Sequence, residues 1–207
     1  MSLVAEKIRI KTLGRMDYEP ALRAMREFTF HRSEATEDEI WLLEHPPVYT
    51  LGQGAPIVSV NNGIAVVRSD RGGQITYHGP GQILLYALVD LARRSIKVKR
   101  FVWLLEQAVI DLLGAHSCTR GERRPGAPGV YVEGAKIAAL GIRVSRGRAY
   151  HGLALNVDMD LAPFAAIDPC GYPGLAVTQT RNLGFPQSPS QLGNDLVKTL
   201  IANLEHA

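Results

Sequence analysis

Cysteine, aromatic residues and long apolar runs are all scarce in this sequence. The 207 residues include 2 cysteines, Cys118 and Cys170, and aromatic side chains make up 7%. Neither cysteine has a Cys-x-x-Cys partner or a paired histidine at ligand spacing, which excludes a zinc knuckle and a disulfide framework. No stretch approaches the roughly 18 apolar residues of a membrane span, and the N-terminus becomes charged before a signal-peptide core forms. We therefore expect a cytoplasmic protein whose thiols stay reduced.

The remaining composition is that of an ordinary folded protein. Hydrophobic residues make up 46% and charged residues 21%, which excludes collagen-like and disordered classes. A chain of this length can bury enough surface to fold without a disulfide or a metal. The length predicts one domain, or one domain with an appendage.

Positive charge is concentrated in one segment. Residues 93–148 contain 12 Lys and Arg against 4 Asp and Glu, a net charge of +8, whereas the remainder carries a net charge of −5. This asymmetry indicates an acidic partner, although a solvated surface explains such segments equally well. Candidate docking residues are Arg93, Arg94, Lys97, Lys99, Arg100, Arg143, Arg146 and Arg148.

Hydrophobic periodicity predicts more strands than helices. Alternation at Lys7–Leu13 and apolar runs farther along indicate strands; the other strand candidates are 39–44, 48–51, 66–67, 83–91, 129–132, 136–144 and 149–157. Helices are expected from Asp17 to about Glu34, over Lys99–Leu113 with a stop at Gly114, and after a cap at Ser190. Because the predicted strands and helices do not alternate one for one along the chain, we predict an α+β fold.

Two segments carry candidate chemistry. The run Arg71–Gln82 combines glycines with polar side chains, which favours a substrate cradle over a bulged hairpin with exposed polar residues. Cys170 lies between Pro169 and Gly171 on an expected loop, where a rigid backbone can present a nucleophilic thiol. A nearby base or cation must favour the thiolate.

Three side chains are candidates for the base or cation that favours the Cys170 thiolate. His78, His151 and Lys136 are the candidates, and no papain-type signature surrounds Cys170. Lys136 opens an apolar strand, so it is either this partner or a lysine that extends to solvent from an edge strand. The two histidines either orient a substrate and stabilise an oxyanion or are satisfied polar groups of the core.

Four motifs resemble those of the lipoyl(octanoyl) transferase family. They are Arg-Gly-Gly-x-x-Thr-Tyr-His-Gly-Pro-Gly-Gln from Arg71, Lys-Ile-Ala-x-x-Gly from Lys136, His-Gly-x-Ala-Leu-Asn from His151, and Pro-Cys-Gly around Cys170. They occur in the family's order, and the resemblance covers most of the chain. Members of this family move an octanoyl group from acyl carrier protein to a lysine of lipoyl domains.

The resemblance implies a role for each matching residue. It makes Cys170 the acyl-thioester nucleophile and Lys136 the residue that lowers the pKa of its thiol. It assigns substrate contacts to three segments; the contact residues are Arg71, Gly72, Gly73, Gln74, Ile75, Thr76, Tyr77, His78, Ala139, Leu140, Gly141, Gly152, Leu153 and Ala154. The family commonly has Ser-Ile-Gly at 139–141, so contacts there would come from the backbone.

The resemblance also implies a fold and partners. It predicts one catalytic domain over residues 1–207, with a mixed or antiparallel sheet flanked by helices, similar to biotin and lipoate protein ligases. The implied partners are octanoyl-acyl carrier protein, the lipoyl domains of 2-oxo acid dehydrogenases and the glycine cleavage H protein, with no nucleic acid, membrane, metal or cofactor. An ATP-dependent lipoate ligase and a non-catalytic acyl-binding module remain alternatives.

Overall fold

The structure is a computed structural model that describes residues 7–56, 60–116, 120–167 and 174–207. Its described helices are α1 (Tyr18–His31), α2 (Val98–His116) and α3 (Pro189–Glu205), with short 3-10 helices η1 (Ala162–Ala166) and η3 (Thr180–Leu183). None of these helices is long and apolar enough to cross a membrane.

The large sheet contains six of the described strands and is mostly antiparallel. Its order is β1-β2-β6-β9-β8-β7, and only β1 and β2 run parallel. The strands are β1 (Ile8–Arg15), β2 (Asp38–Glu44), β6 (Gln82–Asp90), β7 (Gly129–Val132), β8 (Ala135–Ser145) and β9 (Arg148–Asn156).

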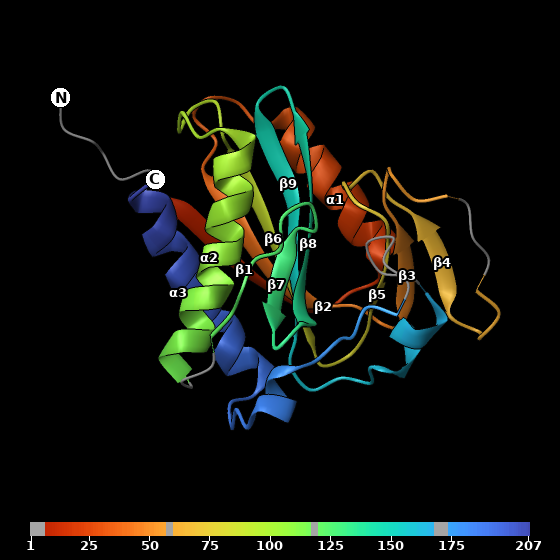
Figure 1. Ribbon diagram of the computed structural model, residues 1–207. Helices are drawn as coiled ribbons and strands as arrows, with labels where there is room; N and C mark the ends of the chain where they lie inside the picture. The colour runs from red at the N-terminus through yellow and green to blue at the C-terminus, as the bar shows by residue number, and fades with distance from the viewer. Residues whose placement is uncertain (1–6, 57–59, 117–119, 168–173) are drawn as a thin grey trace.

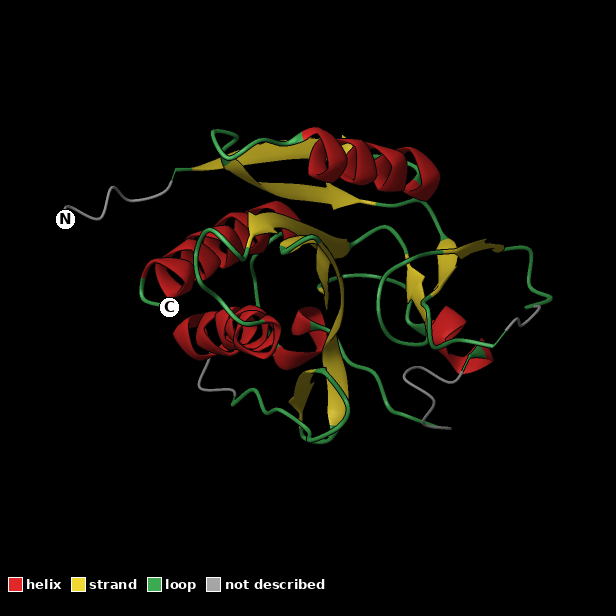
Figure 2. Cartoon of the chain, turned by 90° about the horizontal axis from the view of Figure 1, so that it is seen from above, coloured by secondary structure: helices red, strands yellow, loops and turns green. Residues whose placement is uncertain are grey.

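Helices cover both faces of this sheet. Helices α2 and α3 pack side by side on one face, and α1 covers the other (Figures 1 and 2). Strand β6 is buried along its whole length because Ile83 and Leu85 face α2 and α3 while Leu84 and Tyr86 face α1. A strand buried on both faces appears in sequence as a continuous apolar run, which explains why the 83–91 prediction succeeded within one residue.

A smaller sheet lies beside the large one. Within the described residues it has the order β4-β3-β5, built from β3 (Val48–Leu51), β4 (Ala65–Arg68) and β5 (Ile75–His78). Its apolar side chains form a separate cluster with Phe164 of η1. Figure 1 shows this sheet at the right of the molecule, beyond α1. Residues 75–78, within the run Arg71–Gln82, were not among the predicted strands, yet they pair with β3.

Helix interiors were predicted better than helix ends. The predicted faces of α2 and α3 are buried, but α2 continues through Gly114 to His116, and α1 ends at His31 rather than Glu34. The cap of α3 is Ser188, whose side chain accepts from the Gln191 backbone N–H in a capping box, so the Ser190 prediction was wrong. These ends depend on local hydrogen bonds that several neighbouring residues can supply.

Two of the predicted docking arginines are engaged within the molecule. The buried carboxylate of Asp38 accepts hydrogen bonds from Arg32 at 2.5 Å, Arg93 at 2.8 Å and Arg94 at 2.6 Å. Burial alone would raise the pKa of Asp38, but hydrogen bonds from the Asp90 backbone, Arg32 and Arg94 lower it. Arg93 and Arg94 therefore compensate the charge of a buried carboxylate, and neither offers a free cation for docking.

Candidate active site

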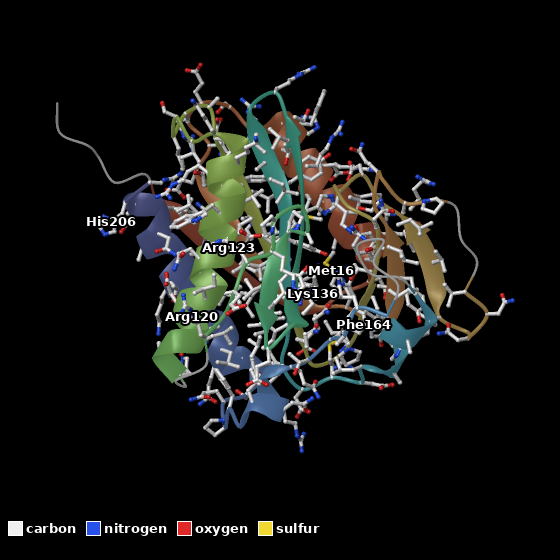
Figure 3. The ribbon with its side chains drawn as sticks, in the orientation of Figure 1. Met16, Arg120, Arg123, Lys136, Phe164 and His206 are labelled. Carbon is white, nitrogen blue, oxygen red and sulfur yellow. The ribbon has the colours of Figure 1, made fainter. Side chains whose placement is uncertain are left out.

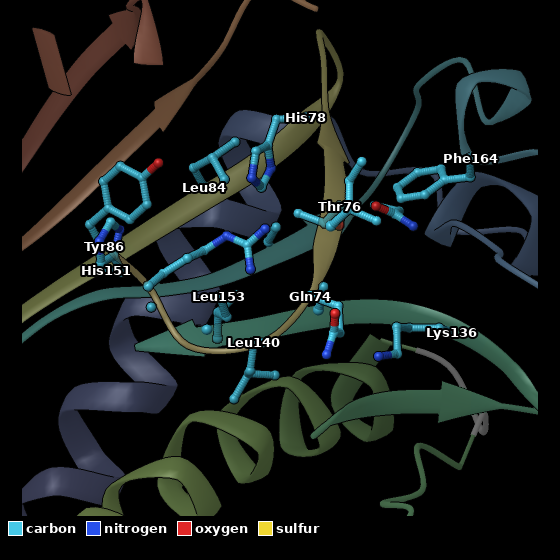
Figure 4. Close-up of a pocket in the computed structure, with 18 of the residues that line it drawn as sticks. Gln74, Thr76, His78, Leu84, Tyr86, Lys136, Leu140, His151, Leu153 and Phe164 are labelled. Carbon is cyan, nitrogen blue, oxygen red and sulfur yellow. The ribbon is translucent and has the colours of Figure 1, made fainter. Parts of the chain in front are cut away.

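A narrow cavity lies between the two sheets. Its open volume is about 50 Å³, and strands β5, β6, β8 and β9 supply most of its wall. Figure 4 shows Lys136 at one end of the cavity and Tyr86 and His151 at the other. The cavity therefore extends from the start of β8 toward the face of the large sheet that α1 covers.

Most of the residues predicted to contact substrate line this cavity. Those that do are Arg71, Gly73, Gln74, Ile75, Thr76, His78, Ala139, Leu140, Gly141, Gly152, Leu153 and Ala154, together with Lys136 and His151. Gly72 and Tyr77 do not line it. The Gly72 N–H donates to Ile142 O at 2.9 Å, and Tyr77 packs against Tyr49 and Phe164. Tyr77 points away because successive side chains of a strand face opposite sides.

Two glycines permit close approach of backbones at the cavity wall. A Cβ at Gly141 would lie 2.9 Å from Gly72 O, and one at Gly152 would lie 2.1 Å from Leu85 O. Gly141 and Gly152 face each other in the β8–β9 pairing. The glycines of the motifs thus bring the Arg71 loop onto β8 and draw β9 close to β6.

The Arg71 guanidinium is buried and fixes the loop on the smaller sheet. Its Nε donates to Thr50 Oγ1 at 3.1 Å, one terminal nitrogen donates to Thr50 O at 2.6 Å, and the other donates to Gly72 O at 3.0 Å. The guanidinium also places a positive charge near two histidines, and it contributes to lowering the pKa of both His78 and His151.

His78 belongs to a chain of buried polar side chains beside the cavity. Gln82 Nε2 donates to Asn156 Oδ1 at 2.9 Å, so Gln82 Oε1 accepts from His78 Nδ1 at 2.8 Å. The other ring nitrogen, His78 Nε2, lies 3.3 Å from Thr50 Oγ1. Burial and the charges of His45 and Arg71 lower the pKa of His78 well below the ordinary value. His78 is therefore neutral with both ring nitrogens partnered, which fits a positioning role better than direct action on substrate.

Asp70 organises the other histidine. Its carboxylate accepts from His151 Nε2 at 2.8 Å, from Tyr150 O–H at 2.6 Å and from Arg26 Nε at 2.8 Å. Burial alone would raise the pKa of Asp70, but these hydrogen bonds lower it below its usual range. His151 has a φ of 61° within β9, a left-handed conformation that is uncommon for residues other than glycine. The left-handed backbone at His151 and the hydrogen bond from its imidazole to Asp70 together place the imidazole at the cavity wall.

We expect Asp70→Asn to lower the pKa of His151. Burial lowers that pKa, whereas the hydrogen bond and charge of Asp70 raise it, so removing the charge leaves the lowering effects in place. The measurement is a pH titration of the His151 ring by NMR, with Asp158→Asn as the control because Asp158 is exposed and paired with Arg181. An unchanged His151 titration in Asp70→Asn would contradict this assignment.

Lys136 lies inside the molecule. It is 3% exposed, and its Nζ donates to Pro128 O at 3.2 Å and lies 5.1 Å from the centre of the Tyr131 ring. It does not extend to solvent, which removes the edge-strand interpretation. Figure 3 shows Lys136 near Phe164, where the large sheet faces the smaller one.

The segment after Cys170 runs beside Lys136. Lys136 N–H donates to Ala176 O at 2.8 Å, and Thr178 N–H donates to Lys136 O at 2.9 Å. Cys170 itself falls outside the described residues, as does Cys118. The described residues Phe164 and Val177, which flank the 168–173 segment, both line the cavity.

Several lining residues were not found by the sequence reasoning. They are Tyr18, Leu84, Tyr86, Asn156, Phe164 and Val177. Asn156 is the last residue of the His-Gly-x-Ala-Leu-Asn motif, so the motif could have identified it as a site residue. The same holds for Asp70, which does not line the cavity but directly precedes Arg71 of the first motif. Tyr18 and Tyr86 carried no such signal, because aromatic residues in apolar segments are usually core residues.

Comparison with known proteins gives relatives over nearly the whole chain. A family model described as the lipoyl protein ligase A/B catalytic domain matches residues 17–200. An octanoyltransferase of Thiobacillus denitrificans is 60% identical over 194 residues, covering 92% of this chain and 88% of the relative. An octanoyltransferase of Dechloromonas aromatica is 55% identical over 198 residues, covering 95% of this chain and 96% of the relative.

Solved structures share the fold at low sequence identity. A lipoate-protein ligase A bound with ATP is 15% identical with a TM-score of 0.78, covering 96% of this chain and 85% of that one. A biotin protein ligase of Aquifex aeolicus is 11% identical with a TM-score of 0.62, covering 95% and 70%. The predicted α+β fold, with mixed sheets flanked by helices as in these ligases, is thereby confirmed.

Proposed function

Because this chain belongs to the family of lipoyl protein ligase A/B catalytic domains, we propose that it is an octanoyltransferase of lipoate biosynthesis. In this proposal residues 1–207 form one catalytic domain, which moves an octanoyl group from acyl carrier protein to a lysine of lipoyl domains. The acceptors would be those of 2-oxo acid dehydrogenases and the glycine cleavage H protein.

The observation that carries this proposal is the contrast between two groups of relatives. Octanoyltransferases reach 55% and 60% identity, whereas the ATP-bound ligase shares the fold at 15%. Members of one fold can differ in reaction, so the high-identity relatives decide which activity is proposed. Transfer from a thioester also needs no ATP, because thioester exchange is nearly neutral in free energy and amide formation from a thioester is favourable.

The cavity is suited to a linear acyl chain. Its wall includes Leu84, Leu140, Leu153 and Phe164, and burying seven carbons at ~0.8 kcal/mol each would contribute about 5–6 kcal/mol. The present opening is narrow, so the chain would enter with movement of lining side chains, which is common on binding. An acetyl group has too few carbons to gain most of this burial free energy, so the cavity favours a medium-length acyl chain over acetyl.

In the first chemical step, the Cys170 sulfur attacks the thioester carbonyl of the donor. A C–S bond forms to Cys170, the C–S bond to the carrier breaks, and the carrier thiol leaves after taking up a proton. The Lys136 ammonium would favour the attacking thiolate by lowering the pKa of the thiol. The backbone hydrogen bonds of Lys136 with Ala176 and Thr178 support this role, since they hold the lysine beside residues that follow Cys170 closely in the sequence.

In the second step, the amine of the target lysine attacks the acyl-enzyme. An amide C–N bond forms, the thioester C–S bond breaks, and the Cys170 thiolate is regenerated. Acylation converts the Cys170 thiolate into a neutral thioester, so the counter-charge of the Lys136 ammonium is removed. Lys136 would then release its proton to solvent and act as the general base, taking up one proton from the incoming amine as the C–N bond forms.

The test is transfer of octanoate to an unmodified lipoyl domain. With octanoyl-acyl carrier protein and no ATP, we expect the mass of the lipoyl domain to increase by one octanoyl group. Modification only with free octanoate and ATP would instead identify a ligase. Saturable uptake of octanoate with neither modification would identify an acyl-binding module.

A further inference from the structure

A second cavity lies at the far end of β8, outside the acyl site. Its volume is about 320 Å³, and it opens between α1 and the β8–β9 hairpin. Ten residues separate Lys136 from Arg146 at the hairpin, which corresponds to about 30 Å of strand. No residue lines both cavities, and they adjoin in β9, where Tyr150 of the second cavity precedes His151 of the first.

Three arginines line this second cavity. Arg26 donates to Asp70 through its Nε–H, Arg148 Nε forms an ion pair with Asp90 at 3.4 Å, and the Arg146 guanidinium lies 5.7 Å from the centre of the Phe30 ring. A guanidinium has five N–H donors, so each arginine retains donors beyond those contacts. Three guanidinium charges face two neighbouring carboxylates, which leaves the cavity net positive.

A buried hydroxyl adds an unsatisfied donor. Thr29 lines the cavity and is 6% exposed, and its Oγ1 has no hydrogen-bond partner among the described residues. A buried polar group without a partner is unusual in a native protein. An acceptor atom within the cavity would satisfy it.

The hairpin holds its arginines in a fixed position. Ser145 pairs with Arg148 across a two-residue turn, and φ is 51° at Arg146 and 77° at Gly147. Positive φ at both central residues is the geometry of a type I′ turn, which is compatible with the twist of the flanking strands. Asn or Gly is usual at the first of these positions, so placing Arg146 there costs conformational free energy.

We propose that this cavity binds a phosphate group, either as free phosphate or as a phosphate ester. Arginine is the side chain best matched to phosphate, because its planar fork can donate two parallel hydrogen bonds to two phosphate oxygens. Thr29 supplies a further hydroxyl donor, and Phe30, which is 68% exposed, flanks the opening beside Arg146. This proposal does not depend on the octanoyltransferase activity.

The experiment is a calorimetric titration of the intact chain with inorganic phosphate, with acetate at matched ionic strength as a second anion. We expect saturable binding of phosphate only, weakened by about tenfold or more in Arg146→Ala and in Thr29→Val. Arg9→Ala is the matched control, since Arg9 is an exposed arginine of β1 paired with Glu37. Coenzyme A, titrated next, distinguishes a site for phosphate esters from a site for free phosphate.

Three results would overturn the proposal. The first is no saturable phosphate binding by the wild type, and the second is equal binding of acetate. The third is an equal loss of affinity in Arg9→Ala and Arg146→Ala. Thermal unfolding of each variant verifies that Arg146→Ala and Thr29→Val are folded, and transfer of octanoate is not the readout. Failure of this proposal is therefore distinguishable from failure of the proposed function.

Discussion

Cys170→Ala is expected to abolish formation of the acyl-enzyme. When the wild type is mixed with octanoyl-acyl carrier protein, intact-protein mass spectrometry should show a mass increase of one octanoyl group. The variant should show none, because alanine has no nucleophile to form the thioester. Transfer to a lipoyl domain should fall by about 10³-fold or more, the scale of losing a nucleophile.

The second cysteine provides a matched control for this result. Cys118→Ala removes the other thiol of the chain and should retain both the mass increase and the transfer. Labelling that survives in Cys170→Ala and disappears in Cys118→Ala would show that the nucleophile has been assigned to the wrong cysteine. Normal transfer by Cys170→Ala would remove the covalent mechanism altogether.

Lys136→Arg is expected to separate the two half-reactions. Arginine keeps the positive charge that favours the thiolate, but it cannot release its proton at physiological pH. The variant should therefore accumulate the octanoyl-enzyme while transfer to the lipoyl domain falls by about 10²-fold or more, the usual contribution of a general base. Single-turnover mass spectrometry measures both steps in one experiment.

Two further variants make this result interpretable. Lys198→Arg changes an exposed lysine of α3 and should leave both steps unchanged. Lys136→Met removes the charge but keeps the chain length, and it should slow acylation as well as transfer. If Lys136→Arg transfers at the wild-type rate, Lys136 does not act as the base of the second step.

The interior elements were the predictable part of the fold. A continuous apolar run predicted β6, and a 3.6-residue repeat predicted the buried face of α2, because burial on two faces or on one helical face leaves a direct record in sequence. The ends of α2 and α3 could not be placed, since Gly114 is accommodated within a helix and Ser188 competes with Ser190 for the cap. The pairing of β5 with β3 was also missed, because its four residues lie in a glycine-rich segment.

The candidate site was predictable where it follows the motifs. Arg71, Lys136 and His151 each begin one of the sequence motifs, and all three line one cavity. Tyr77 shows the limit of motif reasoning, since it lies between two lining residues yet faces the other side of β5. The position of Asp70 next to the motif was visible in the sequence, but its three hydrogen-bond donors were not predictable, because they come from α1 and β9.

The chain's composition and motifs alone determined that it is an α+β protein with a candidate thiol and a candidate lysine, because periodicity and local chemistry are properties of neighbouring residues. Only the tertiary structure decided that Lys136 is buried beside the segment following Cys170, that Arg93 and Arg94 are bound to Asp38, and that Arg26, Arg146 and Arg148 surround one cavity. These facts depend on which strands pair and which helix covers them, and such long-range contacts leave no periodic trace in the sequence.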